Sequence, residues 1–299
     1  MKDLVYELYG IRGTAQPLPS ERDQNFLITA DTGEKFVLKV FNPGEWKTVA
    51  AAQNWVLKHL SQRVSFCQSV ITGLSGRMLG NWDGQWVRLL TYLPGVPLAE
   101  IRPHTPGLLH DLGRKLGQLT RALVDFDHYA VHRDFHWDLA NGNRVVSEYA
   151  ELVADDRLRE LVLKCRVEFD GALRRSVIHG DANDYNVLVD PESMTVSGLI
   201  DFGDMVYSYT VADLAIAIAY VTLSADDYRA AARAVISGYE SEFTLLDEER
   251  EALWPLARLR LAMSVCLAAH QRQQQPDNEY LGISQKAIAQ TLPRICTDD

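Results

Sequence analysis

The sequence of 299 residues contains only four cysteines, and they are scattered along the chain. The spacing C-x-x-C is absent. This absence argues against a structural zinc site and against a framework of disulfides. The thiols are therefore expected to be free and buried, at positions Cys67, Cys165, Cys266 and Cys296.

Long apolar runs and targeting signals are also lacking. The longest apolar run, residues 211–223, is too short to cross a bilayer and carries Asp213 near its start, so it predicts a buried core helix. The first residues, Met1 to Glu7, do not combine a basic region with an apolar run and a cleavage site. A cytoplasmic protein with no membrane partner is expected.

Positive charge is scarce, and its distribution is uneven. The formal net charge is −10, yet residues 1–90 hold ten Lys and Arg against eight Asp and Glu. The excess of acid therefore lies wholly in the remaining residues. Such a balance repels nucleic acid. A solvated acidic surface explains it most simply, and attraction of a small cationic molecule is the alternative.

The apolar pattern divides the chain into two lobes. The hydrophobic content of 47% is enough for a large core or for two lobes around a cleft. Residues 25–40 and 81–93 predict strands, and residues 45–59 predict a helix. The break at Pro94 and Gly95 predicts a boundary between a β-rich lobe, 1–92, and a mostly helical lobe, 93–299. Helices are expected over 108–126, over 152–173 and after Asp201, with a hairpin over 187–200.

The stretch VIHGDANDYNVLVD, residues 177–190, places an acid and an amide five positions apart. Phosphoryl transfer requires a base for the incoming hydroxyl, oxygen ligands for a metal and a cation for the phosphates. In a catalytic loop of protein-kinase type the metal-binding asparagine follows the base by this same interval. Asp181 is thus the expected base, Asn186 and Asp201 the expected Mg²⁺ ligands, and Lys39 the expected phosphate contact.

A second kinase-like triplet, His132-Arg133-Asp134, lies upstream. Five positions after Asp134 comes Leu139, which cannot bind a metal, so this is not the catalytic loop. Two roles stay open for the segment. It is either a structural link between helices or a contribution, together with Trp137, to the substrate pocket.

Two features of a protein kinase are missing. No glycine-rich loop precedes Lys39, so the phosphates would be covered by residues 20–25, with contacts from Ser20 and Asn25. The following helix has Ala51 near the place where a kinase carries a glutamate that pairs with the lysine. Glu45 or Gln53 could substitute for it.

The residues around the two loops carry a family resemblance. His179-Gly180-Asp181 with Asn186, and IDFGD over 200–204, resemble the aminoglycoside phosphotransferase and choline kinase superfamily, and within it the hydroxylysine kinases and their bacterial relatives. The resemblance implies an α+β, bilobal, protein-kinase-like fold. It also implies Mg²⁺, a phosphoryl donor that is ATP or GTP, and an acceptor hydroxyl on a small amino alcohol or hydroxy-amino acid.

The interval after the second loop favours a small acceptor. Asp201 lies 12 residues before Asp213, which leaves no room for a peptide-docking segment. The expected substrate contacts are Asp204, Tyr207, Trp137 and Arg133, and Thr91 and Leu93 are expected to contact the nucleotide. The alternatives are an aminoglycoside phosphotransferase, a choline, ethanolamine or homoserine kinase, and a nucleotide-binding module with a degenerate kinase site. The oligomeric state is not predicted.

Overall fold

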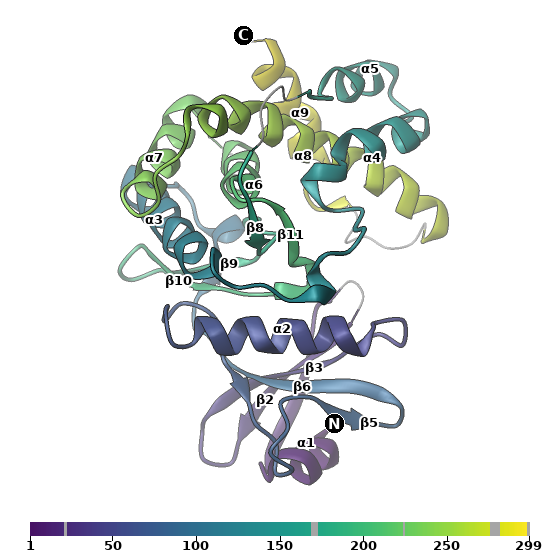
Figure 1. Cartoon of the computed structure of the whole chain (residues 1–299), viewed down its shortest axis with the longest axis vertical. Coiled ribbons are helices and arrows are strands. Elements are labelled where there is room, and N and C mark those ends of the chain that lie inside the picture. Colours follow the sequence, from purple (N-terminus) through teal and green to yellow (C-terminus); the bar gives the residue numbers. More distant parts are fainter. Residues whose placement is uncertain (21–22, 169–172, 224, 276–281, 298–299) are drawn as a thin grey trace.

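The computed structural model describes residues 1–20, 23–168, 173–223, 225–275 and 282–297. A β-sheet with two helices forms the N-terminal part, and helices form most of the C-terminal part (Figure 1). This arrangement confirms the α+β, bilobal fold expected from the sequence. The division at residues 92 and 93 stays a prediction.

The N-terminal sheet is antiparallel and has the strand order β1-β2-β3-β6-β4, with β5 paired to β6. The turn between β2 and β3 contains Gly33 at φ 89°, a backbone conformation that glycine adopts readily. The first strand was not predicted, because GTAQPL has no apolar alternation and contains Pro17. The strands are β1 (Gly13–Leu18), β2 (Gln24–Ala30), β3 (Lys35–Val40), β4 (Val70–Ile71), β5 (Gly80–Trp82) and β6 (Gln85–Thr91).

Two helices accompany this sheet but belong to different cores. Helix α1 (Lys2–Tyr9) buries Leu4 and Val5 in a small core with residues of the sheet. Helix α2 (Lys47–Leu60) instead places Val56 and Leu60 in the large core of the C-terminal part. Figure 1 shows α2 lying between the sheet and the helical part. Helix α2 therefore lies at the junction of the two parts of the fold.

The C-terminal part is built around two buried helices. All residues of α6 are buried, which confirms the core helix predicted from the apolar run. Helix α8 is long and apolar enough to cross a membrane, but 78% of its apolar window is buried inside the fold. The helices are α3 (Pro106–Leu123), α4 (Gly142–Tyr149), α5 (Asp156–Lys164), α6 (Ala212–Thr222), α7 (Tyr228–Glu240), α8 (Asp247–Gln274) and α9 (Gln285–Thr297). Short 3₁₀ helices cover Leu98–Glu100, Tyr129–Val131, Leu139–Asn141, Ala150–Leu152 and Phe202–Asp204.

Two small sheets hold the predicted catalytic segments together. The strands β9 (Val187–Asp190) and β10 (Thr195–Leu199) form the expected hairpin, and β7 (Val96–Pro97) extends it. The strands β8 (Arg175–Ile178) and β11 (Val206–Tyr209) pair with Val206 opposite Ile178. As a result, the loop that follows β8 lies beside the loop that precedes β11.

Some predicted helix bounds differ from the structure. The helix expected over 152–173 is shorter, because α5 ends at Lys164 and Arg175 already belongs to a strand. Residues 169–172 of that prediction lie outside the described residues. Pro255 lies inside α8, within its first turns. The four cysteines form no disulfide, as expected, and Cys296 is only half-buried.

Candidate active site

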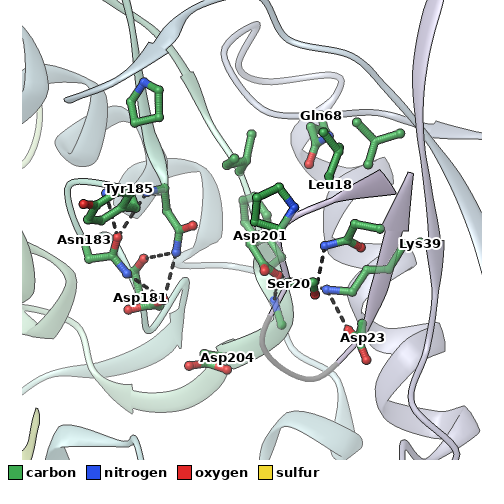
Figure 2. A pocket seen from close by; sticks show the side chains of 18 of the residues that line it. Leu18, Ser20, Asp23, Lys39, Gln68, Asp181, Asn183, Tyr185, Asp201 and Asp204 are labelled. Atoms are coloured by element: carbon green, nitrogen blue, oxygen red, sulfur yellow. Dashed lines mark hydrogen bonds and ion pairs between the residues drawn. The ribbon is translucent and has the colours of Figure 1, made fainter. Parts of the chain in front are cut away.

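A cleft of about 510 Å³ lies between the sheet and the catalytic segments. Figure 2 shows Lys39 and Asp23 on one side of it, Asp181 and Asn183 on the other, and Asp201 between them. Asn186 also lines the cleft. The three oxygen-bearing side chains predicted to act together, those of Asp181, Asn186 and Asp201, therefore share one cleft.

Asp213 at the start of α6 holds the loop that carries Asp181. One carboxylate oxygen of Asp213 accepts a hydrogen bond from His179 N at 2.9 Å, and the other accepts from Gly180 N at 2.8 Å. Gly180 has φ 82°, and a Cβ there would lie 2.5 Å from the carbonyl oxygen of Asp204. Only glycine fits this approach. Asp213 therefore has a structural role, because it holds the backbone of this loop.

The Asp181 carboxylate is surrounded by donors. Its Oδ2 accepts hydrogen bonds from Asn183 Nδ2 at 2.9 Å and from Asn186 Nδ2 at 2.8 Å. Its Oδ1 accepts one from Arg260 Nη2 on α8 at 2.6 Å. Burial raises the pKa of the Asp181 carboxyl, and the positive charge of Arg260 opposes that rise. Asp181 is therefore a carboxyl group with raised proton affinity, as suits a general base.

Asn186 and Asp201 fit the ligands that a hard metal ion prefers. The Asn186 amide nitrogen donates to Asp181 at both the backbone oxygen, 2.9 Å, and Oδ2, 2.8 Å. Its amide oxygen is thereby left as the atom for a metal. The Asp201 side chain is 44% exposed to the cleft and follows β10. Carboxylate and amide oxygens are common ligands of Mg²⁺ and Ca²⁺, so this pair can hold a divalent cation.

Lys39 pairs with two carboxylates. Its Nζ lies 3.1 Å from Asp201 Oδ1 and 2.9 Å from Asp23 Oδ2. The charge of Lys39 holds the pKa of Asp201 well below its usual range. The Asp201 backbone has φ 62°, and its Oδ1 also accepts from Gly203 N at 3.0 Å. The lysine is thus oriented into the cleft without a glutamate from α2.

The substitutes proposed for that glutamate are not the partners of Lys39. Within the described residues its acidic partners are Asp23 and Asp201, and neither Glu45 nor Gln53 pairs with it. Asp23 belongs to the segment predicted to cover the phosphates, but its role was missed. Ser20 and Asn25 of that segment line the cleft, and Asn25 Nδ2 donates to Ser20 Oγ at 3.3 Å. Glu21 and Arg22 lie outside the described residues.

Arg88 is a second cation of the sheet that sequence reasoning missed. It lies opposite Lys39 in the register of β3 and β6, lines the cleft and is 1% exposed. Its Nη1 donates to Asn54 Oδ1 at 3.2 Å. Burial lowers the pKa of Arg88 to about 10, against the raising effect of Asp201 and Asp23. The sequence of β6, QWVRLLT, does not alternate, so it gave no sign that this arginine would be buried.

Of the two predicted nucleotide contacts at the lobe boundary, Leu93 lines the cleft and Thr91 does not. Thr91 Oγ1 accepts a hydrogen bond from Ser69 N at 2.9 Å, and its carbonyl oxygen accepts from Gln68 Nε2 at 3.1 Å. Thr91 therefore ties β6 to the segment before β4. The assignment of Thr91 to the nucleotide is corrected on this ground.

The predicted substrate residues separate into two groups. Asp204 and Trp137 line the cleft, but Arg133 and Tyr207 do not. Arg133 Nη2 donates to the carbonyl oxygens of Gly203 at 2.9 Å and Met205 at 3.0 Å. Arg133 thus fixes the backbone around Asp204 instead of reaching the cleft.

Tyr207 lies away from the cleft, beside the upstream triplet. Its ring stacks on His132 with 4.4 Å between the ring centres, and both residues line a separate surface pocket. Asp134 of the same triplet pairs with Arg144 on α4. These contacts agree with the first alternative for the triplet, a structural link between helices. Trp137, which the second alternative named together with the triplet, lines the cleft. The assignment of Arg133 and Tyr207 to the substrate is corrected accordingly.

The sequence is similar over most of its length to known kinases. Residues 14–274 match the model of a family described as the phosphotransferase enzyme family. A hydroxylysine kinase of Danio rerio is 33% identical over 98% of this chain and 89% of its own length. A homoserine kinase of Methylobacillus flagellatus is 28% identical over 86% of this chain and 77% of its own length.

Solved structures of similar fold are also kinases. The complex of the amicoumacin kinase hAmiN with AMP-PNP, Ca²⁺ and Ami has a TM-score of 0.72 at 15% identity, and covers 98% of this chain and 91% of that one. A microcompartment-associated aminopropanol kinase has a TM-score of 0.72 at 17% identity, with 97% and 94% covered. At these identities the likeness concerns the fold.

Proposed function

We propose that the acceptor of this enzyme is a hydroxy-amino acid or a small amino alcohol of hydroxylysine type. The chain belongs to the phosphotransferase enzyme family and is a small-molecule kinase that acts on a hydroxyl group. The observation that carries the site assignment is the meeting of Asp181, Asn186, Asp201 and Lys39 in one cleft. A base, two metal ligands and a phosphate contact are the parts that phosphoryl transfer requires.

Asp181 is the general base of the reaction. As the acceptor hydroxyl attacks, a bond forms between its oxygen and the γ-phosphorus, and the bond from that phosphorus to the leaving nucleoside diphosphate breaks. The hydroxyl proton passes to the Asp181 carboxylate. Asn183 and Asn186 hold the carboxylate through its Oδ2, which leaves Oδ1 to face the acceptor beside Arg260.

The donor is ATP or GTP, bound with Mg²⁺. When bound, the metal neutralises charge on the triphosphate, and Asn186 and Asp201 would hold it. Lys39 and Arg88 place two positive charges on the sheet side of the cleft, where Ser20 and Asn25 also lie. We assign this side to the phosphates and the side of Asp204 and Trp137 to the acceptor.

The acceptor class rests on the relatives and on the cleft. Hydroxylysine and homoserine, which two relatives phosphorylate by name, are both amino acids with a side-chain hydroxyl. Such a molecule carries an ammonium group, and Asp204 provides an acid at the acceptor end of the cleft. We further propose a cytoplasmic location and no nucleic-acid or membrane partner, since the surplus of charge is negative.

The test is a panel of acceptors, namely hydroxylysine, homoserine, ethanolamine, choline and an aminoglycoside, each offered with ATP or GTP and Mg²⁺. Phosphorylation of hydroxylysine or homoserine above the other acceptors supports the proposal. Preference for the aminoglycoside, together with antibiotic resistance in cells that express the chain, would assign the second candidate function instead.

The base is tested with Asp181→Asn. Because the carboxylate acts on the acceptor and not on the triphosphate, turnover should fall by about 10³-fold or more, while the nucleotide still raises the melting temperature. Asp156→Asn on the surface of α5 is the matched control and should keep full turnover. Appreciable turnover by Asp181→Asn would show that another group is the base.

A further inference from the structure

Arg260 is the cation at the acceptor end of the cleft. Its side chain is 3% exposed, and its guanidinium lies 4.6 Å from the centre of the Trp137 ring and 5.9 Å from that of Tyr220. Among the described residues, the other cations that line the cleft are Lys39 and Arg88, and both belong to the sheet. Arg260 therefore does not serve the phosphate side.

The guanidinium is incompletely satisfied. Nη2 donates to Asp181 Oδ1 at 2.6 Å, and Nη1 reaches the Trp137 carbonyl oxygen only at 3.4 Å. Arg260 Nε is buried and finds no hydrogen-bond partner in the described part of the chain. A buried N–H without a partner is costly, and the planar guanidinium is suited to grip a carboxylate with two parallel N–H groups. The Nε–H group is thus the donor that remains for an anionic ligand.

We propose that the acceptor carries a carboxylate and that Arg260 binds it. The proposal rests on the proposed function and narrows it to amino acids. Asp204, 7% exposed and also lining the cleft, is placed to receive the acceptor's ammonium group. The acceptor thus contributes one charge of each sign to a pocket that holds one acid and one arginine beside the base.

The same face of α8 offers the rest of the pocket. Ser264 and Gln271 follow Arg260 at helical spacing and line the cleft with it. Gln285 at the start of α9 donates to Ser264 Oγ at 3.2 Å, which fixes this wall. Beyond Arg260 this wall carries no charge and combines polar residues with Ala268 and Ile283, so it suits the chain of an amino acid that has both methylene groups and a hydroxyl. No electron or proton passes through Arg260, whose part is binding and positioning.

The first experiment uses the unaltered enzyme and matched acceptors. Hydroxylysine is compared with the diamino alcohol that remains after its carboxyl group is removed, and homoserine with its decarboxylated amino alcohol. The acceptor that lacks the carboxylate should lose about 100-fold or more in kcat/KM. Equal kcat/KM for both members of a pair overturns the inference and leaves the proposed kinase function intact.

The second experiment assigns the effect to Arg260. Arg260→Gln and Arg260→Lys are compared with Arg250→Gln, a control on the exposed end of the same helix. The preference for the carboxylate-bearing acceptor should fall to within about tenfold in Arg260→Gln and to an intermediate value in Arg260→Lys, and should be unchanged in Arg250→Gln. A nucleotide-induced rise in melting temperature shows that each variant is folded.

The two experiments separate the possible failures. If folded Arg260→Gln keeps the full preference, another group binds the carboxylate and the inference is wrong. If no acceptor of either kind is phosphorylated by the unaltered enzyme, the proposed function itself fails. Neither outcome can be mistaken for the other, because the first requires measurable turnover.

Discussion

Lys39 on β3 pairs with Asp23 just before β2, with 2.9 Å between Lys39 Nζ and Asp23 Oδ2. Asp23 is itself fixed, because its Oδ1 accepts hydrogen bonds from the backbone and side chain of Asn42. The lysine thus lies on β3, and its acidic partner directly precedes the neighbouring strand β2. The helix that follows contributes Ala51 near the corresponding position, so α2 is not needed to orient the lysine.

This pairing leads to a prediction for Asp23→Asn. An amide orients Lys39 less firmly than a carboxylate does, so kcat/KM for the nucleotide should fall about tenfold, or about 1.4 kcal/mol. KM for the acceptor should not change. Steady-state kinetics with each substrate varied in turn measure both, with Asp31→Asn in the exposed β2–β3 turn as control. A larger effect on the acceptor than on the nucleotide would contradict the assignment.

Replacement of Arg88 should weaken nucleotide binding and leave the stability of the fold nearly unchanged. Its buried guanidinium has an Nε without a partner, and burial disfavours its charge. Burial of a charged group is costly, so an apolar side chain of similar length in place of Arg88 is expected to cost little stability. Arg88→Met should therefore keep the free energy of unfolding of the nucleotide-free protein within about 2 kcal/mol of the original, although Asn54 loses a donor.

The same variant should bind nucleotide more weakly, because one positive charge is lost on the phosphate side. Titration calorimetry with the Mg²⁺-nucleotide complex should show the loss, and denaturant unfolding gives the stability. Unchanged nucleotide affinity in a folded Arg88→Met would mean that Arg88 serves the sheet alone.

Asp213→Asn tests how the catalytic loop is held. Each carboxylate oxygen accepts one backbone N–H, whereas an amide has a single acceptor oxygen and turns an NH₂ group toward the other N–H. The free energy of unfolding should fall by about 1–3 kcal/mol, and kcat should fall while KM for the nucleotide changes little. Asp247→Asn, whose side chain is 93% exposed, is the control. A drop in stability without any drop in kcat would show that the loop keeps its position by other contacts.

The buried carboxyl group of Asp184 should make the free energy of unfolding depend on pH. Its side chain is 8% exposed, Oδ1 has no partner, and burial raises its pKa to about 6 from the ordinary 3.8. The folded protein therefore holds a proton that the unfolded chain releases, so stability is lost as pH rises from about 4 to about 6. Asp184→Asn removes this loss.

The advantage of Asp184→Asn over the original protein should be small near pH 4 and reach about 1–3 kcal/mol at pH 7. Denaturant unfolding at a series of pH values measures it. An advantage that is the same at every pH would mean that Asp184 is not protonated in the folded state.

Spacing within one segment of the sequence predicted the residues of the candidate site better than it predicted the contacts around them. The interval from Asp181 to Asn186 and the hairpin before Asp201 are local in sequence, so the segment itself indicated that these residues meet. The role of Asp213 was also predictable, because an acid at the start of an apolar helix needs buried donors. The sheet strands followed from alternation for the same local reason.

Long-range partners could not be predicted. Arg260 lies 79 positions from Asp181, and Asp201 lies 162 from Lys39, so their contacts depend on how helices and strands pack. Tyr207 and Arg133 were wrongly assigned to the substrate, because the sequence does not show in which direction a side chain points. Residue type indicates what a side chain can do, but packing decides which group it meets.

The segment after Asp201 has one more consequence. Its strand β11 is already paired with β8, and Arg133 holds the carbonyl groups of Gly203 and Met205 just ahead of it. A segment tied on both sides needs no covalent modification to become ordered. We therefore expect the site to be assembled without a modification step, so that the output of the enzyme in the cell follows the supply of its two substrates.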